Sequence, residues 1–315
     1  MTDPIETDRT LTIGTRGSPL ALYQAYLVRS LLMAAHKSDA TRFPIQIYKT
    51  SGDRLRGDLA EFGGKGLFTK ELEVALTEGH IDLAVHSMKD VPTRSQPDLM
   101  ISSILQREDP RDAFMSNNVK KLMDLPKGAV VGTASIRRRA QLLSVRPDIS
   151  FTLLRGNVGT RLEKLGRGDC DATFLACAGL KRLDQEHIIT EAISTDLMLP
   201  APAQGAIGIE CRREDLVAKN LIAALNHQET HWAVTAERAF LMALDGSCKT
   251  PIAALAEFHG ETLEFRGAVF SKDGRDVFRR ATEIKCRSFE DAFALGLSLG
   301  YELKAEIGDR VLWDD

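Results

Sequence analysis

The sequence contains no long apolar run and no leader-like N-terminus. None of its apolar stretches approaches the roughly 20 residues that a membrane-spanning helix needs. The first ten residues, MTDPIETDRT, are polar and acidic and show no signal-peptide pattern. These absences predict a cytoplasmic protein that has no membrane partner.

Cysteines and aromatic residues are few, and there is no excess of basic residues. The five cysteines (170, 177, 211, 248 and 286) form no CxxC pair, a pattern typical of a reducing compartment rather than of a disulfide framework or a zinc site. Aromatic residues make up 6% of the 315-residue chain, and the formal net charge is −3. A nucleic-acid binder would show a broad basic excess or an aromatic stacking stripe, so we expect no nucleic-acid partner.

Positive charge is concentrated in one place. Residues 132–161 contain six arginines, no lysine and a single acid, Asp148. Three of these arginines (137–139) follow a strand-like AVVGTAS and open a helix-like IRRRAQLL, where cations oppose the helix macrodipole. A bound anion would compensate for this placement, and arginine favours planar, bidentate partners such as carboxylates or phosphates.

Two pairs of segments repeat one another. Residues 11–32 and 129–143 both read as a strand, a Gly-Thr turn and a helix, with Ser18 as a candidate N-cap before Pro19. Residues 68–90 and 160–182 both read as a helix, a turn and a buried strand, which places Asp171 where Asp82 lies. We expect two α/β lobes with mainly parallel strands around a ligand-binding cleft.

The chain is long enough for three domains. QREDPRDAF (106–114) and the proline-rich DLMLPAPAQG (196–205) predict two crossings between the lobes and a hinge. After residue 226 the pattern changes to a helix, strands near 252–259, 262–270 and 276–285, a turn at 271–274 and a last helix that starts at Ser288. We therefore expect domain 1 at 1–106 with 203–224, domain 2 at 111–199 and a small α+β domain 3 at 227–315.

Six arginines lie at predicted strand ends or helix starts and could face one cleft: Arg16, Arg137, Arg138, Arg155, Arg161 and Arg182. Surface arginines also pair with nearby acids, here Asp148 and Glu163, and that alternative stays open for each of them. The glycine-rich charged stretch 49–66 is predicted to be a mobile loop.

Two further residues are candidates for chemistry. Asp90 is an acid at a strand end among these cations, although an aspartate before Val-Pro can also simply form a turn. Cys248 lies in the loop LDGSCKTP beside Lys249, where a thiol should ionise and act as a nucleophile. His86 and Ser87 precede Asp90 but point to opposite faces, which argues against a catalytic triad.

Two other stretches resemble known binding motifs but lack residues that those motifs require. The GGKG stretch lacks the first glycine and the Ser/Thr of a phosphate loop. His227 and His231 have helical i, i+4 spacing, but Glu229 is one position late for HExxH and no third ligand is evident, so we expect no metal.

The chain resembles the porphobilinogen deaminase (hydroxymethylbilane synthase) family over nearly its full length. The motifs that carry the resemblance include IGTRGSPLAL, GGKGLFTKELE, VHSMKDVPT, REDPRDAF, GTASIRR, LRGNVGTRLEKL, PAPAQGAIGIECR and AERAFLMALDGSCKTP. The resemblance implies two lobes like periplasmic binding proteins plus a small C-terminal domain with a three-stranded antiparallel sheet. It also implies a transferase of tetrapyrrole (porphyrin, heme) biosynthesis, which joins four porphobilinogen molecules into hydroxymethylbilane and releases ammonia.

The same resemblance implies roles for individual residues. Cys248 would hold a dipyrromethane cofactor by a thioether, and Asp90 would be the catalytic carboxylate. The implied cofactor-binding residues are Ser87, Lys89, Thr133, Ser135, Arg137, Arg138, Arg161 and Arg182. The implied contacts to substrate or chain carboxylates are Arg16, Ser18, Lys65 and Arg155. Glu61 stands where some members have lysine, and Arg139 has no assigned role.

Two other classes of function compete with this interpretation. A solute-binding protein for dicarboxylates or oxyanions fits the two lobes and the arginines, but not the missing export signal or the Cys248 loop. A phosphate or nucleic-acid binder conflicts with the net acidity. The absence of a leftover apolar stripe predicts a monomer.

Overall fold

The computed structural model describes residues 9–50, 66, 68–94, 96–245 and 250–310. The chain divides into two compact units, described separately below. Unit 1 comprises residues 1–107 and 206–231, and unit 2 comprises 108–205 and 232–315. The predicted loop 49–66 lies mostly outside the described residues, as do Lys65 and Cys248.

Unit 1 is built on a five-stranded sheet, sheet A, with the strand order β2-β1-β3-β10-β4. Its helices and the turn after β3 pack around this sheet. The bounds are β1 Ile13–Arg16, α1 Pro19–His36, η1 Ala40–Arg42, β2 Ile45–Tyr48, α3 Lys70–Thr77, β3 Leu83–Ser87, η2 Met88–Asp90, β4 Leu99–Ile104, β10 Ile207–Arg212 and α7 Leu216–Ala223. The buried strand β3 therefore runs directly into a short turn that carries Asp90.

Local sequence explains where α1 begins and ends. Ser18 caps the helix by accepting a hydrogen bond from the Ala21 amide at 3.3 Å, and Pro19 occupies the first turn, as predicted. Lys37 ends the helix in a left-handed conformation with φ 48°. Ala25, Val28 and Leu32 recur at helical spacing and pack into the core against sheet A.

Unit 2 contains a second five-stranded sheet, sheet B, with the order β7-β6-β8-β5-β9. The bounds are β5 Asp112–Ser116, η3 Leu122–Asp124, β6 Val130–Gly132, α4 Ile136–Val145, β7 Ser150–Thr152, α5 Val158–Gly166, β8 Ala172–Ala176, α6 Cys177–Arg182, η4 Glu186–Ile188 and β9 Glu191–Ala192. Sheets A and B match strand for strand. In each sheet, two neighbouring pairs are parallel and two are antiparallel.

The prediction of mainly parallel strands is therefore wrong for half of the pairings. The reason lies at the crossings: β10 enters sheet A after the chain has passed through unit 2, and it runs antiparallel to both of its neighbours. Its counterpart β5 does the same in sheet B. The second predicted crossing, at 196–205, is followed by β10, which lies in sheet A.

Hydrogen bonds confirm the internal repeat residue by residue. Asp82 accepts the Thr12 amide at 2.9 Å, and Asp171 accepts the equivalent Val130 amide at 2.7 Å. Each acid thereby links the starts of two neighbouring parallel strands, β1 and β3 in sheet A and β6 and β8 in sheet B. Gly14 and Gly132 are also equivalent, since a Cβ would lie 2.3 Å from Ile81 in one and 2.7 Å from Cys170 in the other. Any larger residue at either position would have to displace these side chains.

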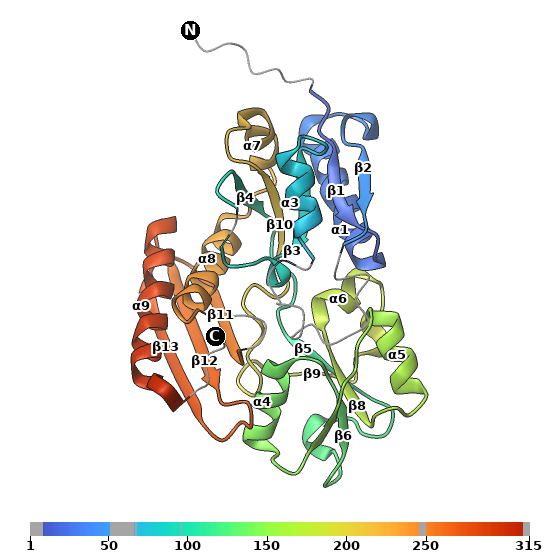
Figure 1. The fold of residues 1–315 in the computed structure, drawn as a ribbon, viewed down its shortest axis with the longest axis vertical. Helices are drawn as coiled ribbons and strands as arrows, with labels where there is room; N and C mark the ends of the chain where they lie inside the picture. Colours follow the sequence, from blue (N-terminus) through green and yellow to red (C-terminus); the bar gives the residue numbers. More distant parts are fainter. Residues whose placement is uncertain (1–8, 51–65, 67, 95, 246–249, 311–315) are drawn as a thin grey trace. The chain divides into compact units, whose positions relative to one another are not determined.

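Unit 2 also contains the antiparallel sheet C, formed by β11 (Ile252–His259), β12 (Thr262–Phe270) and β13 (Val277–Lys285). Helix α9 (Phe289–Ile307) runs along one face of this sheet (Figure 1). Helix α8 (Gln228–Ala243) contributes Phe240, whose ring centroid lies 5.3 Å from that of Phe265 in the shared core. A short 3-10 turn, η5 (Gly308–Arg310), follows α9.

The C-terminal part agrees closely with the sequence prediction. All three strands form, and Ser288 caps α9 by accepting the Asp291 amide at 3.1 Å. Asp291 in turn accepts the Arg287 amide, which completes a reciprocal cap. The α/β class with a three-stranded antiparallel C-terminal sheet is confirmed. Across the described residues, no helix is long and apolar enough to cross a membrane.

Candidate active site

Asp90 lies at the end of the turn that follows β3. Met88–Asp90 form a single 3-10 turn, closed by a hydrogen bond from the Val91 amide to the Met88 carbonyl at 3.2 Å. Met88 is buried, whereas Lys89 and Asp90 are exposed. Among the described residues, no hydrogen bond or ion pair engages the Asp90 carboxylate. Within that part of the chain, this acid is committed neither to a cap nor to a salt bridge.

Ser87, immediately before this turn, is held by a residue that the sequence did not single out. Buried Gln24 of α1 donates its Nε2 to Ser87 Oγ at 2.8 Å. Ser87 Oγ can return a hydrogen bond to Gln24 Oε1 at 3.2 Å. The available signal was a glutamine on the buried side of α1, which it shares with Ala25, Val28 and Leu32, because a buried amide needs a partner.

Arg16 and Ser18 lie at the end of β1 and the start of α1. The Arg16 guanidinium carbon lies 4.2 Å from the centroid of the Phe68 ring, a cation–π contact that orients the side chain. The Ser18 oxygen caps α1, and its hydroxyl hydrogen can still be donated to an acceptor.

A buried polar pair connects β3 to β10 behind the Asp90 turn. His86 Nε2 lies 2.9 Å from Glu210 Oε2, and the two side chains are 4% and 1% exposed. Glu210 Oε1 is buried and has no hydrogen-bond partner among the described residues. Because an unpaired buried charge is expensive, this pair is a specific tie between the two strands rather than incidental packing. Glu210 was missed because it reads as one polar residue in a strand, IGIECR.

In unit 2, Arg137 and Arg138 are buried around one carboxylate. Asp112 is fully buried; it accepts from Arg137 Nη2 at 2.8 Å and from Arg138 Nη2 and Nε at 2.7 and 3.2 Å. Burial alone would raise the pKa of Asp112, but the charges of the two arginines outweigh it and hold the pKa well below its ordinary value. Two cations and one anion leave one net positive charge at the start of α4.

The remaining donors of these arginines reach backbone carbonyls. Arg137 Nη1 donates to Leu199 O at 2.6 Å, and Arg138 Nη1 donates to Phe174 O at 2.8 Å. Gln204 completes the cluster by donating its Nε2 to Asp112 at 3.0 Å. The expected alternative, pairing with an acid, is thus realised for Arg137 and Arg138, but the acid is Asp112 and not Asp148 or Glu163. Asp148 pairs with Arg146 instead.

Asp112 could have been anticipated from the sequence. It opens the apolar strand DAFMS within REDPRDAF, and two buried arginines require an anion. Arg182 is buried at the end of α6 and donates to Gly205 O at 2.6 Å. This bond ties Gly205, the last residue of the segment that leads out of unit 2, to the end of α6.

The other predicted residues of unit 2 lie at helix starts. Ser135 caps α4 by accepting the Arg138 amide, and Thr133 Oγ1 accepts the Ser135 amide at 3.1 Å. Asn157 caps α5, and Arg161 in that helix donates its Nε to Gly156 O at 2.8 Å. Arg155 and Arg161 are only partly buried, unlike Arg137 and Arg138. Exposed Arg139 lies over Phe151, 5.3 Å from its ring centroid, so its visible role is packing.

The described cysteines are buried and poorly suited to act as nucleophiles. They are Cys170, Cys177, Cys211 and Cys286. Burial raises the pKa of Cys177 to about 12 and that of Cys211 to about 11. Neither thiol would be ionised near neutral pH.

His227 and His231, whose spacing only partly matches a metal-binding motif, have local structural partners. His227 Nδ1 accepts the Thr230 amide at 3.3 Å and so caps α8, and His231 Nδ1 pairs with Asn226 Oδ1 at 2.9 Å. Within the described ranges, no group of three or more His, Cys, Asp or Glu side chains could hold a metal ion.

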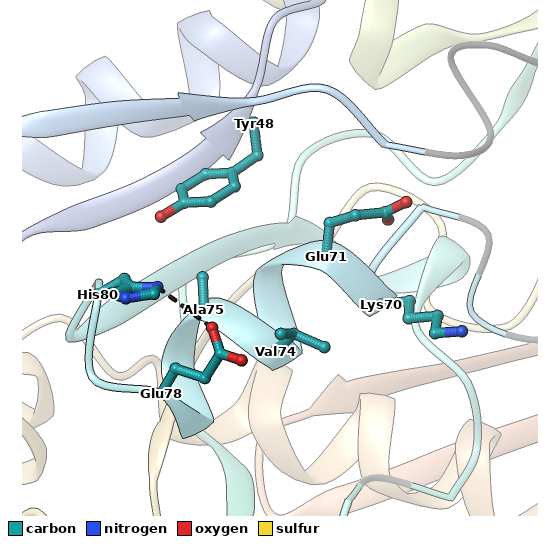
Figure 2. Close-up of a pocket in the computed structure, with 7 residues that line it drawn as sticks. All are labelled: Tyr48, Lys70, Glu71, Val74, Ala75, Glu78 and His80. Atoms are coloured by element: carbon teal, nitrogen blue, oxygen red, sulfur yellow. Dashed lines mark ion pairs between the residues drawn. The ribbon is translucent and has the colours of Figure 1, made fainter.

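A pocket of about 350 Å³ lies elsewhere in unit 1, between the end of β2 and α3. Figure 2 shows Tyr48 on one side and Glu71 and Val74 of α3 on the other, with Glu78 at the C-cap of that helix. His80 forms an ion pair with Glu78 at 3.3 Å. None of the predicted site residues lines this pocket, so we do not assign the chemistry to it.

The fold and these side chains define an α/β protein with a repeated lobe architecture, an accessible acid turn and a set of arginines suited to a carboxylate-rich ligand. Residues 11–220 match the family model for the porphobilinogen deaminase dipyrromethane cofactor binding domain, and residues 232–305 match that for the porphobilinogen deaminase C-terminal domain. The chain belongs to the porphobilinogen deaminase family.

Curated relatives support this over nearly the whole length. The chain is 50% identical to the porphobilinogen deaminase of Paracoccus denitrificans over 305 residues, which cover 96% of each chain. It is 48% identical to that of Nitrobacter winogradskyi over 306 residues, 97% of this chain and 96% of the relative. Among solved structures, a methionine-binding lipoprotein of Bacillus subtilis aligns with a TM-score of 0.44 and 12% identity over 71% of this chain and 92% of that one. A likeness of that size does not extend to function.

Proposed function

We propose that this protein is a porphobilinogen deaminase, a transferase that joins four porphobilinogen molecules head to tail into hydroxymethylbilane and releases ammonia. The observation that carries the proposal is the full-length family match together with an accessible Asp90 on the turn after β3. The activity belongs to tetrapyrrole biosynthesis.

The residues present suit the dipyrromethane cofactor of the family. Each pyrrole ring of such a group carries carboxylates, and the buried Asp112–Arg137–Arg138 cluster retains one net positive charge at a helix start. When bound, the cofactor supplies the pyrrole carbon to which the first substrate molecule is joined. The residues that would hold it are Ser87, Lys89, Thr133, Ser135, Arg137, Arg138, Arg161 and Arg182.

Cys248 is the proposed point of covalent attachment. It lies outside the described residues, and the other cysteines support this assignment. The four described cysteines are buried, and burial raises the pKa of each of their thiols. Cys248 precedes Lys249 in a glycine-containing loop, where a thiolate would be stabilised.

Asp90 would act on the pyrrole nitrogens. As the substrate loses ammonia, positive charge develops on its ring nitrogen, and a fixed carboxylate stabilises that charge without reorganisation of solvent. The same carboxylate can accept and pass on the proton that is lost when two rings are joined. Its exposure and its freedom from other partners among the described residues suit both tasks.

Substrate carboxylates would bind Arg16, Ser18, Lys65 and Arg155. Arg16 is oriented by the Phe68 ring, and the Ser18 hydroxyl can donate while its oxygen caps α1. The proposal further includes a cytoplasmic monomer, without nucleic-acid or membrane partners, that has three domains: 1–106 with 203–224, 111–199, and 227–315.

Intact mass measurement of the purified protein tests the proposal. A mass excess equal to two linked pyrrole units, absent from Cys248→Ser, is expected, together with release of hydroxymethylbilane from porphobilinogen. An unmodified chain that binds dicarboxylates and does not turn over porphobilinogen would instead identify a solute-binding protein. A mass excess that persists in Cys248→Ser would move the attachment to another residue.

A further inference from the structure

We propose that Gly208, through its contact with Met88, positions the catalytic Asp90. Gly208 lies near the start of β10, and Met88 is the first residue of the turn that ends at Asp90. The inference rests on the proposed function, because it concerns the placement of the carboxylate that acts there. Gly208 is a positioning residue and does not itself contact substrate.

The backbone of the turn is tied to the residue that precedes the strand containing Gly208. The Met88 amide donates to the carbonyl of Ala206, directly before β10, at 3.0 Å, and the Val91 amide closes the turn onto the Met88 carbonyl at 3.2 Å. Met88 is therefore the residue through which β10 holds the Asp90 turn.

The side chain of Met88 occupies the space that a Cβ on Gly208 would fill. A Cβ built on Gly208 would lie 2.1 Å from Met88 Sδ, 3.1 Å from Met88 Cγ and 3.2 Å from Ile101 Cγ2. Met88 is only 1% exposed, so its side chain cannot swing out into solvent. Because packed interiors have little free volume, a methyl group at this position must move the Met88 side chain or its backbone.

Sheet B of the second lobe contains an equivalent pair of residues, in which the strand residue is larger and the residue on the turn is smaller. Gly208 lies opposite His86 in sheet A, and its counterpart Ala113 lies opposite Leu175 in sheet B. Met88 corresponds to Cys177, whose amide donates to the Arg111 carbonyl at 3.0 Å, just as Met88 donates to Ala206. Unit 2 thus pairs alanine with a small side chain, whereas unit 1 pairs glycine with a large one.

Only the unit 1 version leads to a catalytic acid. The residue two positions after Met88 is Asp90, and the residue two positions after Cys177 is Gly179. The glycine–methionine combination therefore accompanies a turn whose placement matters for chemistry. A shift of about 1 Å in such a group can lower turnover by as much as a hundredfold.

The test measures steady-state kinetics of holoenzyme variants whose dipyrromethane content is checked by intact mass. Gly208→Ala should lower kcat by roughly tenfold or more, with KM changed less than about threefold, because positioning and not binding is disturbed. The double variant Gly208→Ala with Met88→Cys reproduces the pair of unit 2 and should recover most of the lost kcat. Met88→Cys alone leaves space beside Gly208 and should lower kcat by a smaller factor.

Gly267→Ala is the matched control for general packing damage. A Cβ there would lie 2.7 Å from Phe240 Cζ in the core beneath sheet C, so this variant should lose stability while the folded enzyme keeps its kcat. The inference is overturned if Gly208→Ala keeps the wild-type kcat, if its loss is matched by Gly267→Ala, or if the double variant is no better than Gly208→Ala.

Asp90→Ala in the same assay separates this inference from the proposed function. An inactive Asp90→Ala beside a fully active Gly208→Ala would refute only the positioning role. An active Asp90→Ala would refute the catalytic role on which the inference depends. If Gly208→Ala does not fold, Met88→Cys alone decides the matter, and an unchanged kcat in that variant counts against the inference.

Discussion

The charged groups of the Asp90 turn in unit 1 and of the arginine pair in unit 2 differ in their exposure to solvent and in their partners. Asp90 is exposed, and its carboxylate has no hydrogen-bond or ion-pair partner among the described residues, so water solvates it. Arg137 and Arg138 are 6% and 5% exposed and share Asp112. A solvated acid is easy to place on a turn, whereas buried cations require an internal anion.

The two arrangements also differ in what holds each charged group in place. The carboxylate of Asp112 and the Phe174 carbonyl take up three nitrogens of Arg138, which leaves its guanidinium rigidly oriented. A rigid cation loses little side-chain entropy when it binds a carboxylate. Asp90 depends instead on the backbone turn that carries it, and so on packing beneath that turn.

Asp90→Ala should have the largest effect on activity. Removal of the carboxylate leaves the developing positive charge unstabilised, and kcat should fall by about a thousandfold while the protein stays folded. Asp90→Glu keeps the charge but displaces it, and should retain a measurable fraction of the activity. Exposed Asp98 offers the matched control, since Asp98→Ala should turn over porphobilinogen normally. Equal activity of Asp90→Ala and Asp98→Ala would remove the catalytic half of the comparison.

Asp112→Asn should have the largest effect on folding. It leaves two buried arginines without their counter-charge, and the free energy of unfolding should drop by about 3–5 kcal/mol, together with the dipyrromethane content. Urea unfolding and intact mass measure the two effects. Asp148→Asn, which removes the more exposed partner of Arg146, should lower stability far less. Similar losses in both variants would mean that burial of the arginine cluster contributes nothing specific.

The same cluster predicts a loss of stability in acid. The folded-state pKa of Asp112 lies below the value of about 3.9 that an unfolded chain would show, so its stabilisation is present above pH 4 and declines as the pH falls toward the folded-state value. Below pH 4 the wild type should lose up to about 1.4 kcal/mol more per pH unit than Asp112→Asn. Parallel pH profiles of the two proteins would contradict an ionised Asp112 in the folded state.

Much of the fold could be predicted because its signals are local. A strand followed by a helix recurs in both lobes, although the Gly-Thr pair belongs to the strand end rather than to a turn, with Gly14 and Thr15 inside β1 and Gly132 at the end of β6. Ser18 and Ser288 occupy cap positions, and the three C-terminal strands lie within one or two residues of their predicted bounds. The antiparallel direction of β5 and β10 could not be predicted from periodicity, because a buried strand reads the same in either direction.

The candidate site was harder to predict where it depends on distant pairing. Arg137 and Asp112 are separated by 25 positions, and Gln24 and Ser87 by 63. The residue type predicted that the arginines would bind an anion, but only the fold shows that Asp112, an aspartate of the same chain, is an anion that Arg137 and Arg138 bind. The close approach of Gly208 and Met88 depends on strand register, which no single segment contains.

Asn157→Ala should have the smallest effect and would sharpen the contrast between the buried and the partly buried arginines. Asn157 accepts the Thr160 amide at 2.9 Å and follows Gly156, whose φ of 121° suits glycine. Loss of this cap should lower the free energy of unfolding by about 1 kcal/mol, whereas Asn157→Asp keeps an acceptor and should not. Because Arg161 also bonds to Gly156 O, KM for porphobilinogen should rise less than about threefold with kcat unchanged. A large fall in kcat would instead place Arg161 beside Asp90 in the chemistry.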